Sequence, residues 1–158
     1  MSVTIRPGSD ADAPRVAALM DAVFAEYPDS PFVLAEFPEI ARVASHYRAQ
    51  GGEFWVAERQ GRFVGCFAID EPAPGVFEIH KVYLDRSERG LGLAQRLHDV
   101  AMAFVAARGG RRVRLWSDSR FVSGHRFYEK LGYRRIEGVL RYCPDSTHAW
   151  EYGFDRLL

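Results

Sequence analysis

The chain has 158 residues, of which 47% are hydrophobic and 27% charged, values typical of one globular domain with a buried core. Lys plus Arg and Asp plus Glu both number 21, so the formal net charge is zero; this balance excludes the broad basic surface with which proteins bind nucleic acid or anionic membranes. The two cysteines form neither a disulfide framework nor a metal-binding pair, and no run of roughly 18 apolar residues could span a membrane. The N-terminal residues lack the apolar stretch of a secretion signal. We therefore expect a single domain over residues 1–158, in the cytoplasm.

The first half of the chain shows three strand patterns and two helix patterns. The strand patterns are residues 3–8, 53–70 and 76–84, and the helix patterns are residues 10–27 and 30–50. The middle strand pattern predicts a hairpin, because two β-rich runs flank the turn-type dipeptide Gln60-Gly61. Pro38 is expected to interrupt the second helix or to split it in two.

The second half of the chain continues in the same alternation. The expected elements are a helix after Gly92, a strand over 111–118, a helix over 123–132, and two closing strands over 133–142 and 148–158. Ser123 is the candidate N-cap of the later helix. The order β-α-α-β-β-β-α-β-α-β-β predicts a mixed α/β domain with one central sheet.

The joint between the third long strand and the next helix contains the segment Arg89-Gly90-Leu91-Gly92-Leu93-Ala94. A strand that ends in glycines and opens a helix favours anion binding, because the first helix amides are unpaired and glycine lets a ligand approach the backbone. Arg86, Arg89 and Arg96 would supply local positive charge. The segment lacks the Gly-Lys-Ser/Thr of a P-loop, and Gln95 stands where a dinucleotide fingerprint needs its third glycine. A tight turn without a ligand is the alternative.

The segment LDRSERGLGLAQRL resembles the acetyl-CoA pyrophosphate loop of the GNAT N-acetyltransferases, written [QR]-x-x-G-x-[GA], at Arg89, Gly92 and Ala94. The strand EIHKVYL before it is similar to the fourth strand of that family, and GHRFYEKLGYRR to a later helix motif. The resemblance covers nearly the whole chain and implies the GNAT fold: a central mixed six- to seven-stranded sheet flanked by about four helices. It also implies transfer of an acetyl group from acetyl-CoA to an amine.

The resemblance implies a role for individual residues. Backbone groups of the strand would hold the pantetheine arm and polarise the thioester carbonyl, and the glycine loop would hold the pyrophosphate. The implied cofactor-binding residues are Val82, Tyr83, Leu84, Arg89, Gly90, Leu91, Gly92, Leu93, Ala94 and Tyr128. Tyr128 would act as general acid toward the leaving sulfur, since a phenol with a reference pKa near 10 is protonated at neutral pH.

The base is expected on the strand before the loop. Because side chains alternate along a strand, Glu78, His80 and Val82 should share one face, and either Glu78 or His80 could take the amine proton. A solvated Glu–His pair without a catalytic role is the alternative. Some family members carry a glutamate base in the next strand, where this chain has Trp116, and many carry an asparagine where it has Phe121.

The acceptor is not identified by the sequence. Acidic and aromatic residues in the segments that usually form the acceptor cleft suit a cationic amine; they are Glu26, Tyr27, Asp29, Phe32, Glu36, Glu39, Tyr142, Trp150 and Tyr152. For most of them the alternative is a solvated helix charge or a core aromatic residue. Small metabolites, amino acids and protein amines all stay open, as does a homodimer. No metal is expected, because no His, Cys and carboxylate cluster has metal-ligand spacing in the sequence. The alternative function is a non-catalytic acetyl-CoA-binding module that senses the ligand or regulates a partner.

Overall fold

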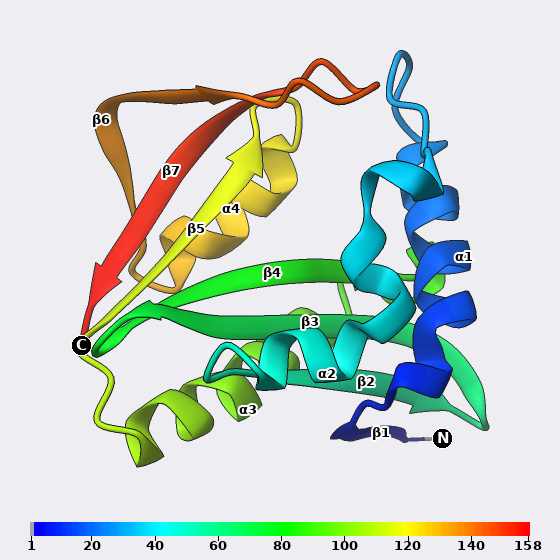
Figure 1. The fold of residues 1–158 in the computed structure, drawn as a ribbon, viewed down its shortest axis with the longest axis horizontal. Helices are drawn as coiled ribbons and strands as arrows, with labels where there is room; N and C mark the ends of the chain where they lie inside the picture. Colours follow the sequence, from blue (N-terminus) through cyan, green and yellow to red (C-terminus); the bar gives the residue numbers. More distant parts are fainter. Residues whose placement is uncertain (1) are drawn as a thin grey trace.

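The computed structural model describes residues 2–158 and contains one seven-stranded sheet with the order β1-β2-β3-β4-β5-β7-β6 (Figure 1). The strands are β1 Val3–Pro7, β2 Glu53–Arg59, β3 Arg62–Ala73, β4 Val76–Leu84, β5 Arg112–Asp118, β6 Arg134–Tyr142 and β7 Trp150–Leu157. The α-helices are α1 Ala13–Phe24, α2 Val43–Arg48, α3 Leu93–Ala107 and α4 Val122–Lys130. Short 3₁₀ turns are η1 Asp10–Asp12, η2 Leu34–Glu36, η3 Pro38–Arg42 and η4 Arg86–Glu88. The predicted mixed sheet with about four helices is confirmed.

The sheet divides into two halves at β4 and β5. These strands are parallel and pair only over Val76–Ile79 and Arg112–Leu115, whereas all other neighbouring strands are antiparallel. Beyond Ile79 and Leu115 the two strands diverge, as Figure 1 shows. We call this point of divergence the fork. The rest of β4 keeps its pairing with β3 but has no partner on its β5 side in the register.

The helices cover the two faces of the sheet with separate apolar clusters. Buried residues of α1, η3 and α2 pack on one face, in contact with side chains of β2 and β3 such as Phe54 and Cys66. Helix α3 and Tyr128 of α4 pack on the opposite face, with Phe67, Phe77 and Leu115. The central strands β2 and β3 are therefore buried on both faces.

A β-bulge in β4 changes the expected side-chain alternation. Cys66 of β3 pairs with Tyr83 and Ala68 with His80, so β4 has one extra residue between these pairs. Lys81 takes up the bulge with a φ of 52°, a left-handed conformation that is uncommon for lysine. Val82 therefore packs toward the α3 face, while Lys81 points toward η3. The prediction that Val82 shares a face with Glu78 and His80 is wrong, because the alternation rule does not allow for a bulge.

The predicted interruption at Pro38 is confirmed, and one predicted helix start is wrong. The segment over 30–50 is divided into η2, η3 and the short α2, and Pro38 is the first residue of η3, where a missing amide hydrogen costs nothing. Helix α4 begins at Val122 with Phe121 as N-cap, so Ser123 lies inside the helix and the N-cap prediction is wrong.

Candidate active site

The glycine loop has the open backbone that anion binding needs. Gly90 and Gly92 have φ values of 77° and 85°, and a Cβ added to either would meet nothing within 4 Å. Gly92 is the N-cap of α3, whose first hydrogen bond runs from the Arg96 amide to the Gly92 carbonyl. The amides of the first turn therefore have no partner within the helix. The loop can receive a phosphate close to its main chain.

The arginines around the loop are less available than the sequence predicted. The Arg89 guanidinium bonds to both carboxylate oxygens of Glu26, just after α1, and donates to the Leu84 carbonyl at 3.3 Å. The Arg89 hydrogen bond holds the pKa of Glu26 below its ordinary value. Arg96 donates to the Val3 carbonyl at 3.0 Å. Backbone amides, with Arg86 exposed beside them on η4, are thus the more accessible donors.

Tyr128 is buried in α4 next to two other aromatic rings. Its ring centroid lies 5.2 Å from that of Phe127 and 5.6 Å from that of Tyr133, and its side chain is 7% exposed. Burial raises the pKa of Tyr128 above its ordinary value, so the phenol stays protonated at neutral pH. Within residues 2–158 no hydrogen bond engages its hydroxyl, whereas the neighbouring Tyr133 hydroxyl bonds to His98 Nε2 at 2.8 Å.

Glu78 and His80 meet in a polar cluster on the α2 side of the fork. His80 Nε2 lies 3.2 Å from Glu78 Oε2 and 3.0 Å from Oδ1 of Asp70 on β3. Arg114 of β5, the register partner of Glu78, donates from Nε to Glu78 Oε1 at 2.8 Å. The Tyr47 ring of α2 lies 5.4 Å from the imidazole. The predicted Glu–His pair is therefore held at the fork by partners on three other elements.

Asp70 was missed in the sequence, although the hairpin pairing that places it opposite Glu78 could have identified it. One ligand atom from each of Asp70, Glu78 and His80 lies within 4.8 Å of the others, so geometry alone allows a cation there. The Arg114 guanidinium already occupies one oxygen of Glu78 and opposes a further positive charge. The hydrogen bond between the His80 imidazole and Asp70, and the one between Arg114 and Glu78, orient the base candidates.

Lys81 is a second residue that sequence reasoning missed. Its Nζ lies 2.7 Å from Glu39 Oε1 of η3, and 5.6 Å and 5.9 Å from the ring centroids of Phe37 and Tyr47. Burial opposes ionisation of Glu39, but the ammonium outweighs this effect and holds the pKa of Glu39 below its ordinary value. The pair ties η3 to the bulge of β4. No pattern in the sequence marks it, since Lys81 was expected on the other face.

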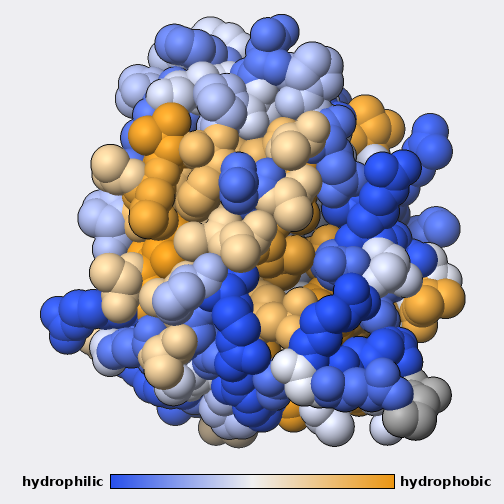
Figure 2. Space-filling view, turned by 90° about the vertical axis from the view of Figure 1, so that its right-hand side faces the viewer, coloured by the Kyte–Doolittle hydropathy of each residue, from blue (hydrophilic) through white to orange (hydrophobic). Residues whose placement is uncertain are grey.

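Three of the four acidic residues expected to attract a cationic acceptor are already engaged by partners within residues 2–158; Asp29 is the exception. Glu26 binds Arg89 and Glu39 binds Lys81, while Glu36 of η2 accepts hydrogen bonds from the amide and hydroxyl of Ser146 in the β6–β7 loop. Figure 2 shows apolar side chains gathered on the face that carries α1 and the segment after it, and Val33 and Leu34 are exposed in that segment. The structure therefore gives no support to a free acidic wall.

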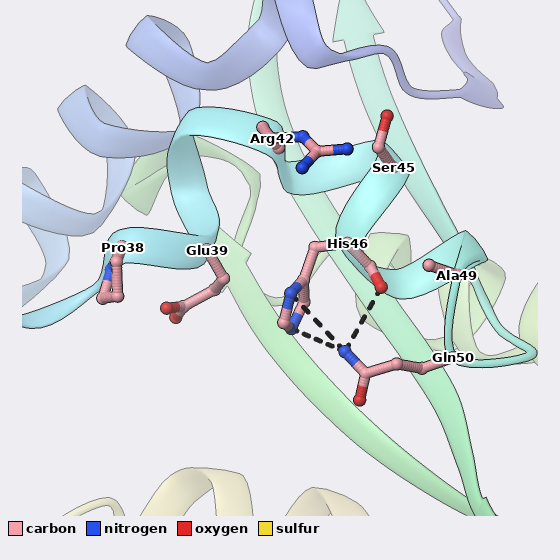
Figure 3. A pocket seen from close by; sticks show the side chains of 7 residues that line it. All are labelled: Pro38, Glu39, Arg42, Ser45, His46, Ala49 and Gln50. Atoms are coloured by element: carbon pink, nitrogen blue, oxygen red, sulfur yellow. Dashed lines mark hydrogen bonds between the residues drawn. The ribbon is translucent and has the colours of Figure 1, made fainter.

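Two concave regions border this part of the molecule. A groove of about 450 Å³ runs along η3 and α2. In Figure 3, His46 and Gln50 lie side by side in it, and the Gln50 amide is 2.9 Å from His46 Nε2. A groove of about 390 Å³ lies between α1 and the β2–β3 turn. Neither is lined by Tyr128 or the glycine loop, so neither by itself is the candidate reaction site.

The two departures from the family pattern lie close together in sequence, Trp116 in the C-terminal part of β5 and Phe121 just after it at the N-cap of α4. Phe121 packs its ring 4.6 Å from that of Tyr27, which joins α4 to the segment after α1. Trp116 lies under the guanidinium of Arg141, whose carbon is 4.4 Å from the indole centroid. His125 is buried, with its Nε2 2.9 Å from the carbonyl of Asp118, so it supports α4 from inside.

Among residues 2–158 no helix has the length and apolar character needed to cross a bilayer.

Residues 16–133 match the model of the acetyltransferase (GNAT) family, and the chain belongs to that family. It is 30% identical over 136 residues to the uncharacterized N-acetyltransferase YjgM of Escherichia coli, covering 82% of this chain and 80% of that protein. It is 32% identical over 138 residues to the mycothiol acetyltransferase of Thermobispora bispora, covering 84% of this chain but 45% of that protein. The chain thus spans less than half the length of the latter relative.

Solved structures show the same fold. An acetyltransferase from Streptococcus agalactiae superposes with a TM-score of 0.85 at 20% identity, covering 99% of this chain and 98% of that one. Ard1 from Thermoplasma volcanium superposes with a TM-score of 0.80 at 20% identity, covering 100% of this chain and 99% of that one. At these identities the likeness defines the architecture and leaves the acceptor open.

Proposed function

We propose that the protein is an N-acetyltransferase that moves the acetyl group of acetyl-CoA directly to a primary amine. The observation that carries this proposal is the order of features along β4. Glu78 and His80 stand at the fork, Val82, Tyr83 and Leu84 follow without a β5 partner, and the glycine loop comes next. A thioester held along this strand would present its carbonyl beside the two candidate bases.

In this proposal the main chain of Val82–Leu84, which has no strand partner on its β5 side, binds the pantetheine arm, and an amide near the bulge polarises the thioester carbonyl. Residues 89–94 hold the pyrophosphate. Glu78 or His80 accepts the proton of the attacking ammonium, directly or through a water molecule. The amine nitrogen bonds to the acetyl carbon, the C–S bond breaks, and Tyr128 donates its proton to the departing sulfur; the second proton that the nitrogen loses as the amide forms restores the phenol through water.

The buried position of Tyr128 supports its assignment as the acid. Its hydroxyl has no hydrogen-bond partner among residues 2–158, and its raised pKa keeps the proton available. Tyr128→Phe should leave stability nearly unchanged and slow acetyl transfer roughly 10²–10⁴-fold, the usual contribution of a positioned acid. Tyr133→Phe is the matched control: it removes the bond to buried His98, so it should cost stability and spare the chemical step.

The assay incubates the protein with acetyl-CoA and a panel of amines and follows the free thiol. Wild-type turnover in Tyr128→Phe would remove the acid role. CoA binding without thiol release from any amine would favour the alternative function, a non-catalytic acetyl-CoA-binding module; the apolar Trp116 and Phe121 at polar family positions are the features that favour it.

We propose that transfer needs no metal, since the thioester already carries the activation. Activity should survive treatment with a chelator. Loss of activity on chelation that a divalent ion restores would instead assign a cation to the cluster of Asp70, Glu78 and His80.

A further inference from the structure

Strands β5, β7 and β6 form the C-terminal half of the sheet. Its face away from α4 carries two arginines, Arg114 and Arg141, whose side chains are held in place by neighbouring residues. Val113, Leu115 and Phe154 pack into the core with Tyr128, so the alternating residues Arg114 and Trp116 point to the opposite face. That face is the one on which Glu78 meets Arg114. It is therefore the side of the fork from which an amine would reach the candidate bases.

Arg141 of β6 is fixed across this face. Its guanidinium lies over the Trp116 ring at 4.4 Å and donates from Nε and Nη2 to Glu151 Oε1 of β7 at 3.1 Å and 2.7 Å. Gly153 of β7 lies beside this stack, and a Cβ there would lie 3.3 Å from Ile136 Cδ1 and 3.4 Å from Trp116 Cζ3. An arginine held by an indole and a carboxylate is preorganised, so it loses little side-chain freedom when it binds an anion.

Both arginines keep donors available. Nε of Arg114 is used by Glu78, and Nε and Nη2 of Arg141 by Glu151, whereas Arg141 Nη1 and the terminal nitrogens of Arg114 have no hydrogen-bond partner within residues 2–158. The Arg141 side chain is 48% exposed and that of Arg114 36% exposed. The surface formed by Arg114, Trp116 and Arg141, which we call the arginine wall, therefore offers hydrogen-bond donors rather than free carboxylates.

The arginine wall adjoins β4 at the fork through Arg114. The β6–β7 loop reaches η2, where the Ser146 amide bonds to Glu36 at 2.9 Å. On the β4 side, Arg114 is the register partner of Glu78 and donates to its Oε1 at 2.8 Å. The charge distribution agrees with an anionic ligand: residues 108–158 contain eleven Lys and Arg against six Asp and Glu.

We infer that the acceptor is an amine that also carries a carboxylate, with the amine at Glu78 and His80 and the carboxylate on Arg141, assisted by Arg114. The inference rests on the proposed function. A purely cationic amine would meet two guanidinium groups beyond the bases. An amine with a carboxylate matches both ends of the site, because a planar guanidinium edge binds a carboxylate in two parallel hydrogen bonds.

The test compares acceptors that differ in the carboxylate alone. Phenylalanine, methionine and lysine are paired with the amines formed by their decarboxylation, and kcat/KM is measured with acetyl-CoA for each. In the wild type the carboxylate-bearing member of each pair should be preferred. Arg141→Gln should lower the ratio within a pair by about 10- to 100-fold, the usual range for a hydrogen bond to a charged group.

Arg135→Gln is the matched control. Arg135 lies on the same strand and also covers an aromatic ring, that of Tyr152 at 3.6 Å, but Tyr152 packs against the α4 core. This variant should keep the wild-type ratio. Turnover with a ratio that Arg141→Gln leaves unchanged would overturn the inference while the proposed function stands.

A binding measurement separates the proposed acetyl transfer from the proposed carboxylate site on Arg141. Calorimetry with N-acetylphenylalanine and with N-phenethylacetamide, in the presence of CoA, needs no turnover. If no amine releases thiol, the proposed function fails. Binding of N-acetylphenylalanine that Arg141→Gln weakens and Arg135→Gln spares would then still support the carboxylate site. Binding that is indifferent to Arg141, or absent in the wild type, would overturn it.

Discussion

Gly92→Ala separates the conformational role of the glycine loop from its proposed binding role. Gly92 has a φ of 85°, and its added Cβ would meet no atom within 4 Å. The folded protein would therefore lose only the cost of a left-handed alanine, about 1–2 kcal/mol, or a few degrees in Tm for a domain of this size. The open space over Gly92 is where we place the diphosphate, so the methyl group should weaken CoA binding by at least about tenfold.

Gly61→Ala is the matched control for this prediction. Gly61 lies in the β2–β3 turn with a φ of 76°, and its added Cβ would also meet nothing within 4 Å. Its stability loss in thermal unfolding should equal that of Gly92→Ala, while calorimetry should show unchanged CoA affinity. Gly92→Glu adds a negative charge and should remove binding. If both Gly92 variants bound CoA as tightly as the wild type, the phosphate site would not be at this loop.

Three further predictions concern charged groups. If Glu78 or His80 is the base, Glu78→Gln or His80→Ala should shift the acid limb of the pH–rate profile; a limb that instead follows the pKa of two different acceptor amines in all variants would show deprotonation in bulk water. The exposed Arg89–Glu26 ion pair should contribute at most about 1 kcal/mol to the stability of the loop. Arg89→Met and Glu26→Gln should therefore each weaken CoA binding by less than about fivefold, and their effects should not add. A much larger loss of CoA affinity in Arg89→Met would mean that the guanidinium itself binds the diphosphate. Burial lowers the pKa of His98 to about 4 from an ordinary 6.5. The unfolded chain therefore binds a proton that the folded chain does not, and the free energy of unfolding should fall as the pH drops from about 6.5 toward 4. Chemical denaturation of His98→Gln should show a shallower fall across that window, and an equal fall would contradict the assignment.

Most of the fold could be predicted from patterns that act locally. The strand alternation, the Gln60-Gly61 turn and the glycine joint each specify a conformation through neighbouring residues, and the structure confirms the corresponding elements. The segment over 30–50 was less predictable, because Pro38 and tertiary contacts with Lys81 set its turns. Its apolar residues still pack in the core with α1, β2 and β3, although the segment does not form one continuous helix.

The candidate site was predictable where it follows one strand and hidden where it crosses strands. Glu78 and His80 could be paired because they lie two residues apart, and the structure places them together. Asp70 and Arg114 join them only through strand pairing. Arg141 reaches Trp116 across β7, past a glycine, and no periodicity in β6 reveals that contact. Contacts of this kind depend on strand order, which the sequence pattern does not fix.

The bulge at Lys81 connects the separate parts of the site. One extra residue in β4 interrupts its ladder with β3 immediately after His80, and the pairing with β5 has already ended at Ile79. The same residue turns Lys81 toward Glu39 and so holds η3 beside the fork. The side of the site proposed to bind acetyl-CoA, the acetyl donor, is therefore built from main-chain groups, which many sequences can provide. The acceptor side is built from side chains of η3, β5 and β6 that can change without disturbing β4. Specificity for the acceptor should accordingly lie in residues such as Arg141 and Trp116, far in sequence from the glycine loop.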